Sequence, residues 1–343
     1  MKKINEWKNF FISRGLPQDT IDRYIFQIKS LRSSELPIVF EVEHLSLLMG
    51  IDYLTIQSMI NGTPRFYREF TIKKRAGGLR TIHAPYPSLL QCQDWIYKNI
   101  LIHCVIHDNA HGYIPRRSIF TNATPHLSCQ VLLKMDLKDF FPSIGMGWVI
   151  NLFSSLGYSH GVSYALASLC CNEGCLVQGA STSPYLTNIL LYGLDDRLAK
   201  LAAKNSLNYT RYADDMTFSG GYISSNFPML IKSIVEQYGL FVNEKKTRLL
   251  INKNKKIVTG LSVSSTSLRI TRDLRRSIKQ EVHYISRYGF ISHVSQKKIK
   301  DPFYLDSILG KVNFWLQTEP SCSDAKKCRD ILLPHFGRNY QLQ

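Results

Sequence analysis

Apolar residues recur at helical spacing over the first sixty positions of the chain, as Ile21, Ile25 and Ile28 illustrate. This spacing places apolar side chains on one face of a helix, so residues 1–60 are expected to be helical. Residues 61–64 then interrupt the pattern with Asn, Gly and Pro, which are typical of turns. The first region is therefore predicted to be a set of helices.

A β-hairpin is predicted next. Residues 65–72 are rich in aromatic and β-branched side chains, residues 73–78 form a basic turn with two glycines, and residues 79–83 return toward two prolines. Strand-forming runs on both sides of a glycine-containing turn are the signal of a hairpin. Apolar residues from Leu89 to Ile100 then predict a helix.

The middle of the chain mixes both periodicities. The apolar run at 131–135 is bounded by polar residues and predicts a buried strand that ends at Asp136. A helix is predicted from Ser183, its N-cap, to Leu198, with a proline in the first turn. Residues 208–219 predict two short strands around an acidic turn.

Later segments continue this irregular alternation. Residues 228–238 predict a helix closed by Gly239, and residues 257–263 predict a strand. Thr271 is expected to cap a helix whose apolar side chains continue to Ile285 and whose other faces are basic. Strands interleaved irregularly with helices indicate an α+β fold and not a doubly wound sheet.

The net charge indicates the class of partner. The chain has 343 residues, with 43 Lys and Arg against 26 Asp and Glu, and a formal net charge of +17. Residues 243–343 contain 20 of these cations and only 8 of the acids. A polyanion is the expected partner, and nucleic acid is the commonest one. An anionic membrane surface is less favoured, because the basic segments lack a large aromatic face.

Composition excludes several other classes. A chain that is 44% hydrophobic and 20% charged is not disordered, and no apolar run reaches the ~18 residues that cross a bilayer. No cleaved signal peptide is expected, because the chain begins directly with an amphipathic pattern. Eight scattered cysteines indicate reduced thiols in the cytoplasm. Cys322, Cys328 and His335 lack a fourth partner for zinc.

Three carboxylates are candidates for catalysis. Asp136 follows the predicted buried strand, and Asp214 and Asp215 occupy the predicted acidic turn. Carboxylates that meet in space repel each other, and a hard divalent cation relieves that repulsion. Two such ions about 3.5–4 Å apart support phosphoryl transfer. The alternatives are a polar β-turn at Asp214 and Asp215 and a capping role for Asp136.

Several motifs resemble those of reverse transcriptases. Residues 212–215 (Tyr-Ala-Asp-Asp) resemble the YxDD motif, residues 136–141 resemble the first palm motif, and residues 178–184 resemble the QGxxxSP motif between them. The hairpin at 73–80 is similar to the fingers of this family, and residues 238–247 are similar to its fourth palm motif. The motifs occur in the family's order along the chain.

Two shorter elements resemble those of retron reverse transcriptases. They are the NAxxH element at 122–126 and the VTG element at 258–260. The whole resemblance covers about residues 65–263. Alternatives are a reverse transcriptase of another bacterial class, intron-encoded or of the abortive-infection type, and an RNA-binding scaffold with incidental polymerase activity.

The resemblance implies a right-hand polymerase fold of fingers, palm and thumb. The expected regions are an N-terminal helical region (1–60), fingers (61–130), a palm with the catalytic acids (131–263) and a basic helical thumb (264–343) that binds RNA and duplex.

The resemblance also implies a metal site. Asp136 and Asp214 are expected to be the main ligands of two Mg²⁺ ions, and Asp215 is expected to lie near the primer end and to bind metal less directly. The main-chain carbonyl of Leu137 is expected to complete one metal shell.

Five residues are implied to contact the nucleotide. Lys73 and Arg80 are expected to bind the triphosphate, and Gln178 the nucleotide or template. Phe141 is expected to block a ribose 2′-hydroxyl, with core packing as the alternative. Lys246 is a candidate for proton donation or phosphate contact, with a solvated lysine as the alternative.

Two further sets of residues are candidates for RNA binding. Asn122 and His126 are interpreted either as an RNA contact or as an Asn-capped turn with a packed histidine. The basic face of the predicted thumb helix is expected to grip RNA and duplex through backbone charge and shape, and it comprises Arg272, Arg275, Arg276 and Lys279.

As a whole, the resemblance implies RNA-directed DNA synthesis from dNTPs in a retron. The enzyme is expected to copy part of a partner non-coding RNA of the msr–msd type into single-stranded DNA (msDNA), starting from the 2′-hydroxyl of a guanosine. The product is then an RNA–DNA hybrid. A separate effector protein and a role in anti-phage defence are implied as well.

Overall fold

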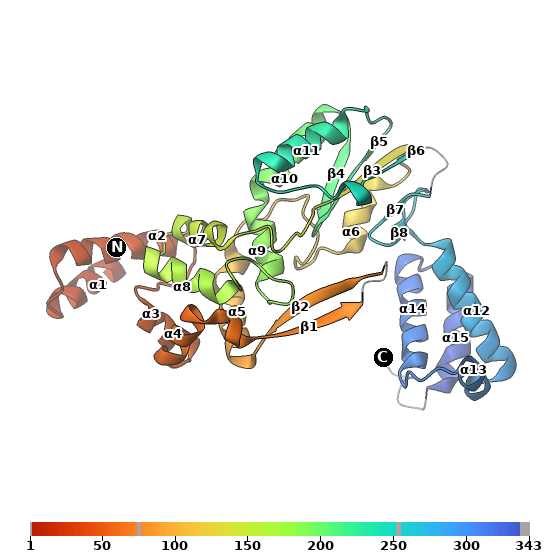
Figure 1. Ribbon diagram of the computed structural model, residues 1–343, viewed down its shortest axis with the longest axis horizontal. Coiled ribbons are helices and arrows are strands. Elements are labelled where there is room, and N and C mark those ends of the chain that lie inside the picture. The colour runs from red at the N-terminus through yellow and green to blue at the C-terminus, as the bar shows by residue number, and fades with distance from the viewer. Residues whose placement is uncertain (1, 74–76, 252–254, 337–343) are drawn as a thin grey trace.

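The computed structural model describes residues 2–73, 77–251 and 255–336 of the chain. A group of four helices forms the N-terminal end in Figure 1, as the apolar spacing predicts. Buried side chains on α2, such as Ile21, Ile28 and Leu31, fix its inward face. These helices are α1 (Lys2–Ser13), α2 (Gln18–Ser33), α3 (Val42–Met49) and α4 (Tyr53–Asn61).

The predicted hairpin forms and projects from the molecule. Its two strands, β1 (Tyr67–Lys73) and β2 (Leu79–Pro85), are antiparallel and pair along their full length. Part of the predicted basic turn, at 74–76, lies outside the described residues. The flanking helical elements are η1 (Thr63–Phe66), α5 (Pro87–Asn99), η2 (Leu101–His103), α6 (Ile119–Ala123) and η3 (Thr124–His126).

A four-stranded antiparallel sheet lies at the centre of the molecule. Its strand order is β4-β5-β3-β6, so the predicted buried strand β3 is flanked on both sides. Alternate residues of β3, including Leu133 and Met135, enter the largest hydrophobic core. The strands are β3 (Val131–Asp136), β4 (Asn208–Tyr212), β5 (Asp215–Gly220) and β6 (Arg248–Ile251).

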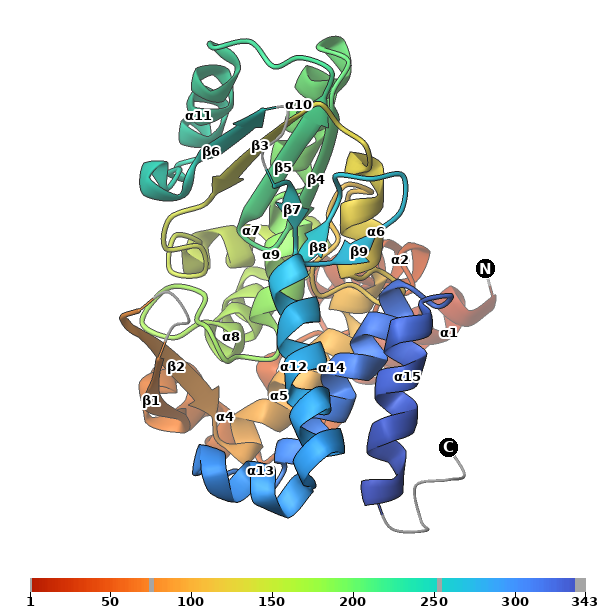
Figure 2. The same ribbon diagram turned by 90° about the vertical axis from the view of Figure 1, so that its right-hand side faces the viewer.

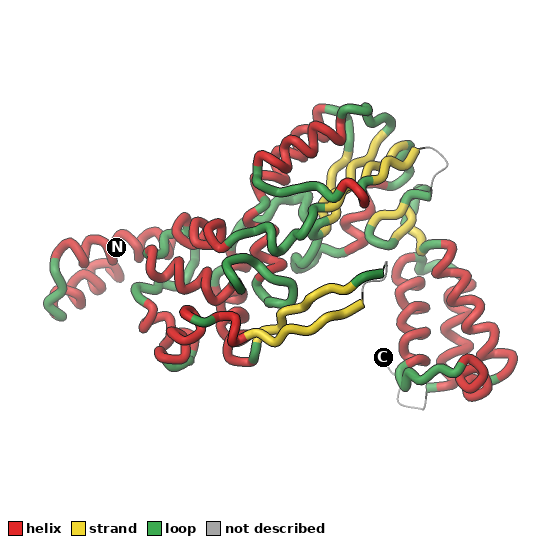
Figure 3. Tube along the Cα trace, viewed as in Figure 1, coloured by secondary structure: helices red, strands yellow, loops and turns green. Residues whose placement is uncertain are grey.

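Further helices connect the strands of this sheet, and Figure 3 shows them in red. They are α7 (Met146–Ser155), α8 (His160–Cys170), α9 (Ser183–Leu190), α10 (Tyr192–Lys204), α11 (Phe227–Gln237) and the short η4 (Glu244–Lys246).

Two predicted elements are wrong in detail. The single helix expected from Ser183 to Leu198 is divided into α9 and α10, because Leu191 leaves helical geometry (φ −91°, ψ 8°). The Ser183 hydroxyl is buried without a hydrogen bond, and Thr182 precedes the helix instead. The strand expected at 257–263 is a hairpin, since Thr259 and Gly260 both adopt positive φ.

That hairpin belongs to a small three-stranded sheet below the central one. Its strands are β7 (Ile257–Val258), β8 (Leu261–Ser262) and β9 (Arg269–Ile270). Val258 and Leu261 pack with Ala123 of α6 and Leu132 of β3, which joins this sheet to the back of the central sheet. The predicted Asn122 and His126 lie in this region.

The C-terminal region is a helical bundle with a core of its own around the fully buried Trp315. Thr271 caps α12 as predicted, because its hydroxyl accepts a hydrogen bond from the Leu274 amide (3.3 Å). Figure 2 shows α12 and α15 side by side along the molecule. The elements are α12 (Arg272–Tyr288), α13 (Phe290–Lys297), α14 (Tyr304–Thr318), α15 (Ser323–Leu332) and η5 (Leu333–His335).

The arrangement confirms the expected α+β class, with a helical N-terminal group, a projecting hairpin, a sheet-based centre and a helical C-terminal bundle (Figure 1). None of the helices within residues 2–73, 77–251 and 255–336 is both long and apolar enough to cross a membrane.

Candidate active site

The fold brings Asp136 against the acidic turn. Asp136 is the register partner of Asp215 on β5, and the amide of Leu137 donates to the carbonyl of Asp214 (2.9 Å). Directly opposed residues of an antiparallel pair lie on the same face, so the Asp136 and Asp215 side chains share one face. Three acids that are distant in sequence therefore lie in one corner of the sheet.

The turn that presents Asp214 is supported from below by a buried ion pair. Tyr212 pairs with Asp215, which leaves Ala213 and Asp214 as a two-residue turn with Ala213 at φ +57°. The Arg211 guanidinium, fully buried, pairs with Asp195 (2.6 Å and 2.8 Å) and donates to the Ala213 carbonyl (3.1 Å). The turn is thus tied to α10 beneath the sheet.

The acidic corner has an excess of negative charge. Burial, together with the carboxylates of Asp136 and Asp215, raises the pKa of Asp214 to about 6. Burial also raises the pKa of Asp215, against the opposing charge of Lys134. Lys246 partly compensates this excess, because its Nζ contacts both oxygens of Asp136 (2.9 Å and 2.8 Å).

The donor set fits a divalent cation, although the side chains are not gathered around one. In the part of the chain that the structure describes, no three His, Cys, Asp or Glu side chains converge closely enough to hold a metal ion. Asp136 is instead directed at Lys246, and Asn243 donates to it as well (3.4 Å). The strand register therefore brings the three acidic residues together as predicted, but their side chains do not converge on one point. The raised pKa of Asp214 marks a site where a cation relieves repulsion.

The chain matches known proteins over most of its length. The family model described as "Reverse transcriptase (RNA-dependent DNA polymerase)" matches residues 72–286. The retron Ec86 reverse transcriptase of Escherichia coli is 34% identical over 274 residues, which cover 77% of this chain and 84% of that protein. The chain belongs to the retron reverse transcriptases. It is an RNA-directed DNA polymerase, and members of its family use divalent metal ions.

Two further comparisons cover less of the proteins concerned. The retron Mx65 reverse transcriptase of Myxococcus xanthus is 38% identical over 243 residues, or 65% of this chain and 57% of that one. The solved apo telomerase from Candida tropicalis aligns at a TM-score of 0.44 and 12% identity, covering 78% of this chain and 57% of that chain.

The basic residues of the fingers hairpin of this retron reverse transcriptase do not share one face. Lys73 is the register partner of Leu79, and Arg80 is the partner of Ile72. Neighbouring pairs alternate in direction, so Lys73 and Arg80 leave the hairpin on opposite faces. Arg80 is the one whose charge reaches Tyr113 beside Asp214. Lys74 and Arg75, in the basic turn, lie outside the described residues.

Gln178 lies where the palm meets the fingers. Its carbonyl accepts a hydrogen bond from the His83 amide of β2 (2.8 Å). At Gly179 (φ +122°) a Cβ atom would lie 2.4 Å from the His83 carbonyl oxygen, so no larger residue fits. The backbone of this motif thus lies in direct contact with the hairpin.

Phe140 and Phe141 differ in exposure. Phe140 is only 6% exposed and belongs to the core, whereas Phe141 is half-buried and packs against it with ring centroids 5.2 Å apart. Phe141 therefore keeps a surface that a ribose can meet.

Sequence reasoning missed the loop before α6, which touches the turn that presents Asp214. The His111 amide donates to the Arg211 carbonyl (2.8 Å), and a Cβ atom on Gly112 would lie 2.8 Å from the Ala213 nitrogen. Tyr113 follows at φ +63°, and its pKa is raised by burial and by the Asp214 charge. The sequence signal for this loop was a single glycine between a histidine and a tyrosine, in a stretch where no helix or strand is predicted.

Asn122 and His126 lie in the interior, which corrects the expected RNA contact. They are 1% and 0% exposed, so neither side chain meets an RNA. His126 is hydrogen-bonded to Ser219 (2.6 Å) and Thr210 (2.8 Å), and burial lowers its pKa to about 3. The Asn122 amide reaches Thr259 (3.4 Å). These contacts tie α6 and η3 to the central sheet and to the turn at Thr259.

The predicted basic face forms on α12. Its side chains line an open groove of about 670 Å³ whose lining is Arg272, Arg275, Arg276, Lys279, Gln280 and His283. Arg275 pairs with Glu319 (2.8 Å) and Lys279 pairs with Asp324 (2.5 Å). Within the described residues, no acid pairs with Arg272 or Arg276. These two cations are therefore free to meet phosphate.

Proposed function

We propose that this retron reverse transcriptase copies part of a structured non-coding RNA of the msr–msd type into msDNA, using a guanosine 2′-hydroxyl as the first nucleophile. The observation that carries the proposal is the register pairing of Asp136 with Asp215 beside the Asp214 turn, in a chain of the retron family. The product of such priming is a branched RNA–DNA hybrid.

Two Mg²⁺ ions are proposed to bind at the acidic corner. Asp136 and Asp214 would be the main ligands, Asp215 would lie close to the primer end, and the Leu137 carbonyl would complete one shell. Bound Mg²⁺ supplies activation of the attacking hydroxyl and stabilises the leaving pyrophosphate oxygen. Burial and the neighbouring carboxylates together raise the pKa of Asp214, and this local excess of negative charge supports a cation there.

The protein groups around the corner are proposed to hold the incoming dNTP. Arg80 binds the triphosphate, with Lys73 reaching it from the other hairpin face, and Gln178 contacts the nucleotide or template. Phe141 excludes a ribose 2′-hydroxyl. Lys246, whose Nζ contacts Asp136 at this corner, would meet phosphate there.

The wider setting is part of the same proposal. The groove of α12 grips the partner RNA and the duplex through backbone charge, which its exposed arginines support. We place the enzyme in the cytoplasm, together with a separate effector protein, in a system of anti-phage defence.

Analysis of the nucleic acid made by the enzyme tests this proposal. The protein is co-expressed with its neighbouring RNA, and the product is treated with ribonuclease and then with a 2′–5′ debranching enzyme. We expect a short DNA that shifts in length on debranching, and no such DNA from an Asp214→Asn, Asp215→Asn variant. DNA without a branch would refute priming from a 2′-hydroxyl, and equal synthesis by the variant would refute the catalytic site.

A further inference from the structure

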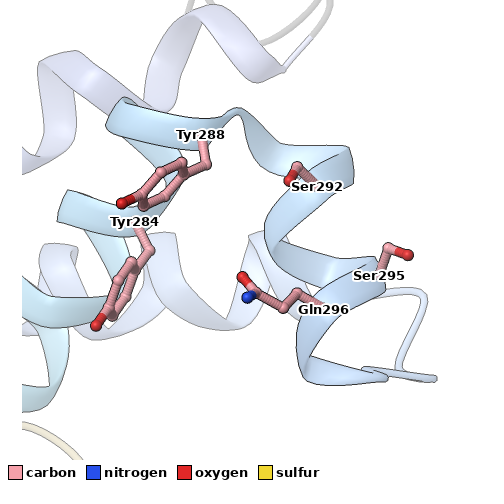
Figure 4. Close-up of a pocket in the computed structure, with 5 residues that line it drawn as sticks. All are labelled: Tyr284, Tyr288, Ser292, Ser295 and Gln296. Carbon is pink, nitrogen blue, oxygen red and sulfur yellow. The ribbon is translucent and has the colours of Figure 1, made fainter.

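The thumb has a second open pocket, of about 540 Å³, between α12 and α13. Two aromatic and three small polar side chains line it, namely Tyr284, Tyr288, Ser292, Ser295 and Gln296. Figure 4 shows the two tyrosine rings next to each other on α12 and the Gln296 amide reaching from α13 toward them. A flat aromatic surface beside a hydrogen-bonding group is what holds an unpaired nucleobase in RNA-binding proteins.

The rings are held in place by a stack that continues into the bundle. The Tyr288 and Tyr284 centroids are 6.1 Å apart at 24°, and those of Tyr284 and His293 are 6.1 Å apart at 15°. His293 is 4% exposed and lies in hydrogen-bond contact with the Tyr304 hydroxyl (3.0 Å). Tyr288, at the outer end, is 53% exposed. The stack therefore ends in a fixed, accessible ring.

A glycine turn brings the polar side of the pocket opposite the rings. Gly289 adopts φ +81° and ψ 154°, a region open essentially to glycine alone. Its amide donates to the Ile285 carbonyl (2.9 Å), and its carbonyl accepts from the His293 amide (3.1 Å). This turn folds α13 back on α12, which positions Gln296 across from the tyrosines.

Charge indicates which class of molecule enters the pocket. Arg276, Gln280, Tyr284 and Tyr288 are spaced four apart on α12, so the basic groove and the tyrosine rings lie along one stripe of the helix. The Arg287 guanidinium lies 5.7 Å from the Tyr288 ring centroid. A polyanionic strand that follows the groove with its phosphates thus reaches the pocket with its bases.

We propose that this pocket binds one unpaired base of the partner RNA, stacked on Tyr288 and hydrogen-bonded to Gln296, while phosphates several nucleotides further along the strand lie along the groove of Arg272 and Arg276. This inference rests on the proposed function, because it names how the thumb distinguishes a structured RNA with unpaired bases from a plain duplex. The groove recognises backbone, and the pocket recognises an exposed base.

Fluorescence titration with two RNA probes tests the pocket. One probe is a hairpin with 2-aminopurine in its loop, and the other is a fully paired duplex of equal length with the same label. Stacking on a tyrosine quenches 2-aminopurine, so the parent is expected to quench the hairpin probe alone. Tyr288→Ala should lower hairpin affinity about tenfold and abolish the quench, with duplex affinity unchanged. Tyr288→Trp should restore both hairpin signals.

Matched variants separate this effect from general weakening. Tyr222→Ala removes a tyrosine that is 75% exposed outside the thumb and should behave as the parent. Arg276→Ala should weaken both probes alike. Equal hairpin binding by parent and Tyr288→Ala, or an equal loss on both probes, overturns the inference.

The same proteins are assayed for extension of a DNA primer on an unrelated RNA template. Tyr222→Ala is expected to extend it as the parent does, because this exposed residue lies outside the thumb. If the parent fails to extend, the proposed function fails, while the hairpin–duplex difference still decides the pocket.

Discussion

The palm and the thumb use charge in opposite ways. In the palm, Arg211 and Asp195 are both 0% exposed, and they support a turn on which a single carboxylate is presented. In the thumb, Lys279 and Asp324 are 46% and 49% exposed, and the remaining cations line an open groove. Breaking a buried pair leaves an uncompensated charge, whereas an exposed pair is solvated when broken.

The difference matches the work proposed for the two regions. Nucleotidyl transfer depends on a few groups held at fixed positions, so each is indispensable. Gripping a nucleic-acid backbone depends on the sum of many phosphate contacts, so each is replaceable. Substitutions should therefore have large effects in the palm and small ones in the thumb.

The largest effect is expected at Asp136. Asp136→Asn keeps the size of the side chain and removes the charge that faces the acidic turn, so primer extension should fall by about 10³-fold. The measurement is single-turnover extension of a DNA primer on RNA. Asp139→Asn, an exposed acid in the same motif, serves as the control and should retain the parental rate. Near-parental extension by Asp136→Asn would contradict the assigned site.

The buried ion pair is expected to dominate palm stability. Asp195→Asn leaves the Arg211 charge unpaired and should lower the free energy of unfolding by about 3–5 kcal/mol, as measured by urea denaturation. Arg211→Met combined with Asp195→Asn should recover most of that loss, because no buried charge remains. The double variant should still extend primers slowly, since the Ala213 carbonyl has lost its donor.

An exposed pair provides the contrast. Asp324→Asn breaks the contact with Lys279 and should leave the denaturation midpoint unchanged. If breaking the exposed pair of the thumb lowers stability as much as breaking the buried pair of the palm, the distinction between the two regions is lost.

A pH-dependent effect of intermediate size is expected at Asp214. Its pKa of about 6 lies above its usual range, so the folded protein holds a proton that the unfolded chain has lost, and stability falls as pH rises toward 6. Above pH 6 the ionised carboxylate destabilises the metal-free fold. Asp214→Asn should therefore melt about 2–4 °C above the parent at pH 8 with a chelator present. The difference in melting temperature between the variant and the parent should decrease below pH 6.

The Asp139→Asn variant again serves as the control, with the same difference from the parent at both pH values. If the difference in melting temperature between Asp214→Asn and the parent increases on acidification, the effect has the opposite sign. That result would exclude a buried Asp214 carboxylate that its neighbours repel.

The smallest effect is expected for a single groove cation. Arg276→Ala should weaken binding of an RNA duplex a few-fold and reduce the slope of log affinity against log salt by about 1. Filter binding over a salt series measures both quantities. Arg32→Ala, an exposed arginine of α2 at the other end of the molecule, should change neither. An unchanged slope for Arg276→Ala would exclude a phosphate contact.

The sequence predicted the features that arise from local pattern. An apolar run ending in Asp136 and an acidic turn between two strands place the acids on neighbouring strands, and strand register then brings them together. Thr271 was recognisable as a cap because capping depends on residues three positions apart.

The features that could not be predicted from the sequence depend on partners that are distant along the chain. Lys246 contacts a carboxylate 110 positions earlier in the chain, and Arg211 is buried only because Asp195 lies beneath it. A charged residue in a sequence resembles a solvated one until its partner is known. The two interpretations of His126 could not be separated for the same reason, since its partners Ser219 and Thr210 belong to other strands.

The lack of a side chain at Gly179 limits how the hairpin can move. The hairpin backbone at His83 lies so near that even a methyl group would be in its way, and the Gln178 carbonyl is bonded to the same residue. The hairpin is therefore held against the palm near its base. Any closure over a nucleotide must bend the hairpin between His83 and its tip, so only that outer part can move.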